Sequence, residues 1–103
     1  MDMRVGEIKE VQDHPNADKL YVLKVWLGEE IGEKIIVSGI KESYKKEELT
    51  GKKIIVITNL EPVVLRGVKS GGMLLAACEP CDGGEKVSLL IPDSDVSNGC
   101  KIS

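Results

Sequence analysis

Aromatic side chains are scarce in this chain, which has no phenylalanine, one tryptophan and two tyrosines. Proteins that hold single-stranded nucleic acid stack successive bases on aromatic side chains, so this composition leaves few platforms for such binding. If the chain binds a nucleic acid, we expect recognition through the backbone and the shape.

Long apolar segments are also missing. No apolar run approaches the roughly 18 residues that a membrane-spanning helix needs, and the first four residues, Met-Asp-Met-Arg, are too polar for a secretory signal peptide. We therefore expect a cytoplasmic protein that has no membrane partner.

Residues typical of catalytic sites are few as well. His14 is the only histidine, and the pattern supports neither a Ser-His-acid arrangement nor a pair of carboxylates. We expect no catalytic residue, and we interpret His14 as a loop histidine rather than a ligand or a proton-transfer group. The sequence thus predicts a binding protein and not an enzyme.

The three cysteines do not complete a familiar site. Cys78 and Cys81 form a C-x-x-C motif, and Cys100 lies close to the last residue. A structural zinc ion normally takes four ligands, and a thioredoxin-type pair normally begins a helix, whereas this pair precedes a glycine-rich turn. We expect a local structural pair, either reduced or disulfide-linked, with zinc or redox function as the alternative. No metal and no cofactor is predicted.

The chain has 103 residues, of which 42% are hydrophobic and 30% charged. This length is enough to close one core without help from disulfides, and we predict one domain over residues 1–103. The net charge of -3 is unusual for a protein that binds nucleic acid. Residues 34–69, however, carry eight Lys or Arg against four Asp or Glu. If these side chains share a face, they attract phosphate locally; alternatively, some of the lysines only solvate a helical turn.

Short apolar and β-branched runs alternate with turn residues along the chain. The pattern predicts strands at 4–11 (bent, with a possible bulge), 20–27, 34–38, 53–58, 73–78 and 87–91. Residues 41–49 form the only expected helix, with Ser43 as a candidate cap. Many short strands and one short helix are typical of a small closed antiparallel barrel, so the fold class predicted is all-β.

Residues 66–73, Arg-Gly-Val-Lys-Ser-Gly-Gly-Met, form a polar island between two apolar runs. Three glycines allow the backbone to approach a ligand closely and leave amide N–H groups uncovered. Arg66 and Lys69 add positive charge, Ser70 adds a small donor and acceptor, and Met73 begins an apolar run that predicts a buried strand. We interpret the island as a loose loop that forms a phosphate-binding edge; the alternative is an ordinary glycine-rich turn with scattered surface charge.

Four separated motifs resemble the tRNA-binding domain family, in that family's order and over nearly the whole chain. They are His-Pro-Asn-Ala-Asp-Lys-Leu at 14–20, Val-Ser-Gly-Ile at 37–40, Asn-Leu-Glu-Pro at 59–62, and Leu-Arg-Gly-Val-Lys-Ser-Gly-Gly-Met-Leu-Leu-Ala-Ala at 65–77. The family includes free-standing tRNA-binding proteins, the C-terminal domain of many methionyl-tRNA synthetases, and endothelial monocyte-activating polypeptide II. The resemblance implies a five-stranded oligonucleotide/oligosaccharide-binding (OB) barrel with extra C-terminal strands.

The resemblance also implies a tRNA-binding surface. Position by position it selects Asn16, Lys19, Ser38, Arg66, Ser70 and Met73, and the charge of the polar island adds Lys69. Turn chemistry alone would also explain Asn16 and Ser38, and burial in the core would explain Met73. Where the family usually has glutamate, this chain has Gly71, so the role of that carboxylate is lost.

The partners that the resemblance implies are tRNA, a second copy of the chain and an aminoacyl-tRNA synthetase. The family's free-standing members are homodimers, and apolar residues such as Leu89, Leu90 and Val96 would be covered in a dimer. We expect the chain to grip the folded corner of tRNA without reading its sequence. Starting at Met1 with almost no leader favours a free-standing protein, acting alone or in trans with a synthetase, most simply the methionyl enzyme.

A polypeptide-binding chaperone is the alternative function. Residues 91–102 and the acidic balance resemble a related branch of the superfamily whose members assist protein export as homodimers. The segments Asp-Lys-Leu at 18–20 and Ser-x-x-Met at 70–73 fit the tRNA-binding branch instead. We therefore prefer tRNA binding.

Overall fold

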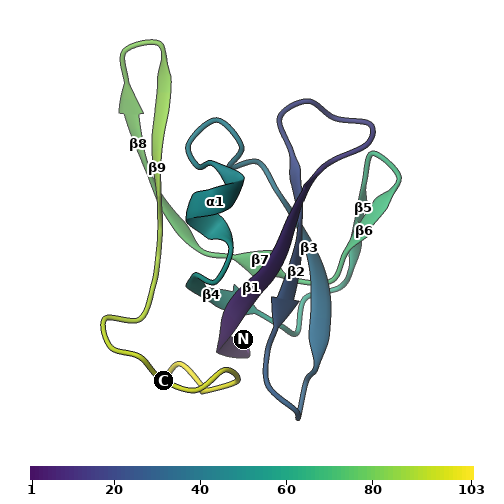
Figure 1. The fold of residues 1–103 in the computed structure, drawn as a ribbon, viewed down its shortest axis with the longest axis vertical. Coiled ribbons are helices and arrows are strands. Elements are labelled where there is room, and N and C mark those ends of the chain that lie inside the picture. The colour runs from purple at the N-terminus through teal and green to yellow at the C-terminus, as the bar shows by residue number, and fades with distance from the viewer.

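A computed structural model describes residues 1–103, and its centre is an antiparallel five-stranded sheet (Figure 1). The strands lie in the order β3-β2-β1-β4-β7. Their bounds are β1 Met3–Asp13, β2 Tyr21–Trp26, β3 Glu33–Ser38, β4 Lys53–Ile57 and β7 Met73–Leu74. The predicted all-β fold with a five-stranded OB-type barrel is confirmed, and β1 carries the expected bulge, where its register with β2 shifts between Ile8 and Glu10.

Two hydrogen bonds bring the ends of this sheet together. The Gly71 amide donates to the Ile35 carbonyl over 2.7 Å, and the Val37 amide donates to the Ser70 hydroxyl over 3.0 Å. Both bonds join β3, at one end of the strand order, to the segment that leads into β7, at the other end. The sheet is therefore a nearly closed barrel.

The barrel interior is built from the alternating side chains that the sequence indicates. In β2 and the residue after it, Tyr21, Leu23, Val25 and Leu27 are all buried, and the residues between them are partly exposed. Period-two alternation sends successive side chains to opposite faces of a strand, so one face of β2 fills the core. The other strands add mostly isoleucine and valine to the same cluster.

The single helix, α1, spans Lys46–Leu49 and is shorter than the predicted 41–49. Lys45 is its N-cap, and the Glu48 carboxylate accepts a hydrogen bond from the Lys45 amide over 2.9 Å. The proposed cap Ser43 is wrong, because its amide closes a turn on the Ile40 carbonyl before the helix begins. Leu49 alone enters the core from this helix.

Two hairpins lie outside the barrel sheet. β5 (Val63–Leu65) pairs with β6 (Val68–Ser70), and β8 (Ala76–Cys81) pairs with β9 (Gly84–Leu89). The expected strand 73–78 is thus divided between β7 and β8, and the expected strand 87–91 begins earlier and ends at 89. The β8–β9 hairpin stands away from the barrel at the upper left of Figure 1.

The last residues run back along β1. Where β2 leaves that strand, Arg4 forms an isolated antiparallel bridge with Lys101, and the Val5 amide donates to the Cys100 carbonyl over 2.9 Å. The two ends of the chain consequently lie side by side at the bottom of Figure 1. No helix of the structure combines the length and the apolar character needed to cross a bilayer.

Candidate functional site

The polar island predicted as a loop forms a β-hairpin over most of its length. Arg66 and Gly67 are its two-residue turn, and both have positive φ, 52° and 89°. Two successive left-handed residues make the tight turn that suits the twist of paired strands. Residues 68–70 then form β6, and the Gly71 amide is used in the bond to Ile35. The prediction of a loose loop with uncovered amides is therefore wrong for this amide.

The hairpin has two faces of different character. Val63 pairs with Ser70 and Leu65 with Val68, whereas Val64 pairs with Lys69. Directly opposite residues of an antiparallel pair share a face, and neighbours along a strand alternate. Val63, Leu65 and Ser70 line a pocket, so Lys69 projects from the opposite face.

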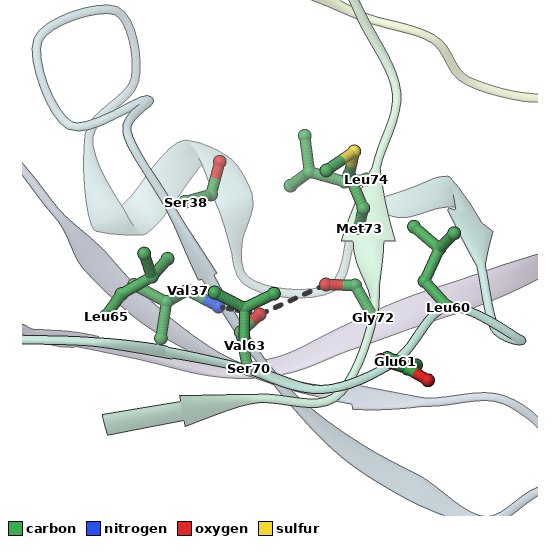
Figure 2. A pocket seen from close by; sticks show the side chains of 10 residues that line it. All are labelled: Val37, Ser38, Leu60, Glu61, Val63, Leu65, Ser70, Gly72, Met73 and Leu74. Atoms are coloured by element: carbon green, nitrogen blue, oxygen red, sulfur yellow. Dashed lines mark hydrogen bonds between the residues drawn. The ribbon is translucent and has the colours of Figure 1, made fainter. Parts of the chain in front are cut away.

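The pocket encloses about 230 Å³ between the hairpin, the end of β3 and β7 (Figure 2). Six of its ten lining residues are hydrophobic. The lining residues are Val37, Ser38, Leu60, Glu61, Val63, Leu65, Ser70, Gly72, Met73 and Leu74. Ser38, Ser70 and Met73, which the sequence placed on the binding surface, thus come together at one cavity.

Met73 is 54% exposed, so the alternative that placed it in the core is wrong. Ser70 differs: it is only 6% exposed, and its hydroxyl accepts from the Val37 amide and donates to the Gly72 carbonyl over 3.0 Å (Figure 2). The hydroxyl therefore serves first to join the hairpin to β3. Met73 offers a free apolar side chain, while Ser70 fixes the pocket wall.

Asn16 lies beside the hairpin turn. Its side-chain amide donates to the Arg66 carbonyl over 3.1 Å, although 50 residues separate the two in sequence. Next to it, His14 is 5% exposed, and its Nε2 lies 2.8 Å from the Leu65 carbonyl oxygen. The structure thus places the 14–19 loop against the turn of the hairpin, and sequence reasoning missed the part of His14 in that contact. The sequence did contain a signal for this contact, because His14 is the only histidine and belongs to the same motif as Asn16.

The three predicted cations differ in their pairing. Lys19 lies 3.6 Å from Glu42, and both side chains are largely exposed, so this ion pair adds little stability. Arg66 and Lys69 make no ion pair and are exposed. The two cations of the hairpin are the ones that remain free to meet phosphate.

Ion pairs neutralise part of the excess positive charge of residues 34–69. Lys46 and Lys41 both bind Asp13, at 2.9 Å and 3.0 Å, and their hydrogen bonds hold the pKa of that carboxyl below its usual value. Lys53 likewise pairs with Asp95 over 2.8 Å. Acidic residues from the first and last thirds of the chain thus neutralise part of the middle third, which the sequence alone did not indicate.

The cysteines lie away from this site. Cys78 and Cys81 are both exposed on β8, and all three thiols are free. Residues three apart on a strand point to opposite faces, so of the two forms expected for this local pair the structure has the reduced one. Desolvation and the nearby Glu85 carboxylate raise the pKa of the Cys78 thiol, which disfavours its reactive thiolate.

Comparison with known proteins bears on this site directly. Residues 3–101 match the family described as "Putative tRNA binding domain". The chain belongs to this family. It is 57% identical over 102 residues to the methionine–tRNA ligase of Pyrococcus furiosus, an alignment that covers 99% of this chain and 13% of that protein. The chain thus spans about one-eighth of the length of such curated relatives.

Two solved structures resemble the fold over nearly the whole chain. The CsaA chaperone protein from Picrophilus torridus is 41% identical with a TM-score of 0.87, over 99% of this chain and 91% of that one. A MetRS related protein from Pyrococcus horikoshii is 36% identical with a TM-score of 0.85, over 99% and 89% of the two chains. The tRNA-binding domain resemblance predicted from the motifs is confirmed.

Proposed function

We propose that this chain binds tRNA through its folded shape and its phosphates, without reading its sequence. The observation that carries the proposal is the β5–β6 hairpin, which presents the unpaired cation Arg66 at its turn and the unpaired Lys69 on the face opposite an apolar pocket lined by Met73. Structured RNA is commonly recognised through shape, phosphates and 2′-hydroxyls rather than through base edges. Membership of the tRNA-binding family supports the same ligand.

The seven predicted residues take different parts in this proposal. Arg66 and Lys69 meet phosphates, and Lys19 adds a third charge once it leaves Glu42. Met73 and Ser38 contact the RNA at the pocket. Asn16 and Ser70 act mainly by holding the hairpin, through their bonds to Arg66 and Val37.

The chain is, in this proposal, a binding module in the cytoplasm with no reaction of its own. Relatives at 55–57% identity are methionine–tRNA ligases, which supports delivery of tRNA to a methionyl-tRNA synthetase, in cis or in trans. We also propose a homodimer. The exposed Leu90, Ile91 and Val96 in the C-terminal part supply apolar surface for a second copy, whereas Leu89, predicted to join them, is buried in the core at 6% exposure.

Polypeptide binding is the second candidate, because a CsaA chaperone is among the similar structures and the pocket is largely apolar. A pocket of about 230 Å³ also accommodates a large apolar side chain. The free cations Arg66 and Lys69 on the same hairpin favour RNA over a general unfolded chain.

The test is a titration of the protein with two folded tRNAs of different sequence and with an unstructured RNA of equal length. We expect the two tRNAs to bind alike and the unstructured RNA to bind much more weakly. An unfolded polypeptide is added as a competitor and should not displace tRNA. Equal binding of folded and unstructured RNA would contradict the proposal, and displacement by the polypeptide would favour the chaperone function.

A further inference from the structure

His14 uses both ring nitrogens in contacts that fix its protonation. The Asn16 backbone amide donates to Nδ1 over 2.9 Å, and Nε2 lies 2.8 Å from the Leu65 carbonyl oxygen. A backbone amide can only donate and a carbonyl can only accept, so Nδ1 must be bare and Nε2 must carry the proton. This network assigns the neutral Nε2–H tautomer.

These bonds fasten together two segments that are distant in sequence. Through Nε2 the ring holds the hairpin at Leu65, and through Nδ1 it holds Asn16, whose side chain in turn donates to the Arg66 carbonyl over 3.1 Å. Arg66 is the only non-glycine residue with positive φ, a conformation that needs support from its surroundings. Figure 1 shows the loop between β1 and β2 beside the tip of the β5–β6 hairpin.

We propose that neutral His14 is a positioning residue that presets the turn of the β5–β6 hairpin, and with it Arg66, for tRNA. The proposal rests on the tRNA-binding function proposed above. A second proton would turn Nδ1 into a donor that faces the Asn16 N–H donor, so this bond would be lost on protonation. Acid favours the doubly protonated imidazolium, so the hold on the hairpin weakens as the pH falls.

Other charged groups of the surrounding segments do not supply the same effect. None of them forms a hydrogen bond with the His14 ring, whose two partners are backbone atoms of Leu65 and Asn16. The groups are Asp13, which pairs with Lys41 and Lys46, Asp18 and Lys19 in the same loop, Glu42 paired with Lys19, and Arg66 and Lys69 in the hairpin. His14 is the only imidazole among these groups.

The direction in which tRNA affinity changes with pH distinguishes the loss of the His14 contact from general electrostatics. Acid makes a protein more positive, and a more positive protein binds a polyanion more tightly. Loss of the Nδ1 contact predicts the opposite, a weaker complex at lower pH. Measured tRNA affinity at pH 7.5 and pH 5.5, at one salt concentration, therefore discriminates between the two.

Two variants divide the contacts of the ring. In His14→Asn the side-chain oxygen can still accept from the Asn16 amide but cannot reach Leu65, and in His14→Gln the amide can reach Leu65 without serving Asn16. Neither side chain titrates. We expect the parent's affinity to fall about threefold to tenfold between pH 7.5 and pH 5.5, the effect of one lost hydrogen bond. Both variants should bind more weakly than the parent at pH 7.5 and should not weaken further in acid.

A nuclear magnetic resonance titration of the parent gives a second readout that needs neither tRNA nor a variant. The ring nitrogens of His14 should show the Nε2–H tautomer at pH 7.5, and the Asn16 and Arg66 amide signals should shift with the titration of His14. The inference would be overturned if the parent bound tRNA equally well or more tightly in acid. It would also be overturned if the Asn16 and Arg66 amide signals did not shift when His14 is protonated. Absence of tRNA binding at pH 7.5 would instead contradict the proposed function, and the amide signals would then decide separately whether His14 sets the turn.

Discussion

Gly28 and Gly99 meet where the end of β2 crosses the C-terminal segment. A Cβ atom on Gly99 would lie 2.7 Å from the Leu27 carbonyl oxygen, and one on Gly28 would lie 2.7 Å from the Asn98 carbonyl oxygen. Both residues also have positive φ, 91° and 85°. Because the opposing atoms belong to the backbone, they cannot rotate away as a side chain would.

Gly83 is the matched control for this crossing, since its φ is 83° and a Cβ there would meet nothing within 4 Å. Gly83→Ala should lower the free energy of unfolding by about 1 kcal/mol, the cost of the left-handed backbone alone. Gly99→Ala should cost about 1–3 kcal/mol more, because the backbone must also shift to relieve the overlap. Urea denaturation measures both values, and equal losses would show that the crossing is not tight.

Single residues also show how far the sequence leads at the site. The motifs selected Asn16, Ser70 and Met73, and the structure brings all three to the region of the β5–β6 hairpin. The sequence could not indicate that the Ser70 hydroxyl is already hydrogen-bonded to the Val37 amide and the Gly72 carbonyl. The Val37 partner depends on the closure of the barrel. Nor could it show that Lys41 and Lys46 are neutralised by Asp13, which lies 28 residues or more away in the chain.

At the scale of elements, strands with clear alternation were predictable, and composite segments were not. The β2 strand follows its period-two pattern closely. The glycines of the island at 66–73 favour a loop, although β-branched residues lie on either side of Arg66 and Gly67. Two such runs separated by two residues predict a hairpin, so the signal was present. The division of 73–78 between β7 and β8 carries no local signal, since each strand depends on a distant partner.

The prediction of a homodimer can be tested at the exposed apolar residues that follow β9. Light scattering of the parent at micromolar concentration should give the mass of two chains. Replacing Leu90 and Ile91, which are exposed beyond β9, with glutamate should produce monomers, because charge opposes burial at an interface. The matched control is Val64→Glu, at a side chain 65% exposed on the hairpin, which should stay dimeric. A monomeric parent would contradict the proposal, and a monomeric Val64 variant would move the interface to the hairpin.

At the scale of the whole molecule, the net charge of -3 must be reconciled with binding a polyanion. Some lysines elsewhere on the chain are engaged by carboxylates, as in the pairs of Lys24 with Glu10 and Lys53 with Asp95. Other lysines, among them Lys34, Lys52 and Lys86, form no ion pair. Arg66 and Lys69 remain unpaired on one hairpin. A small number of well-placed charges, rather than a basic surface, is what the proposed function requires.

The salt dependence of tRNA binding tests this account most directly. Affinity should fall as salt rises, and Arg66→Gln and Lys69→Gln should each lower the slope of log affinity against log salt by about one unit, because each removes a phosphate contact. Met73→Ala should weaken binding at every salt concentration and leave the slope unchanged, since it removes apolar contact without charge. If removing both Arg66 and Lys69 leaves the slope of the parent intact, the hairpin is not the surface that holds tRNA.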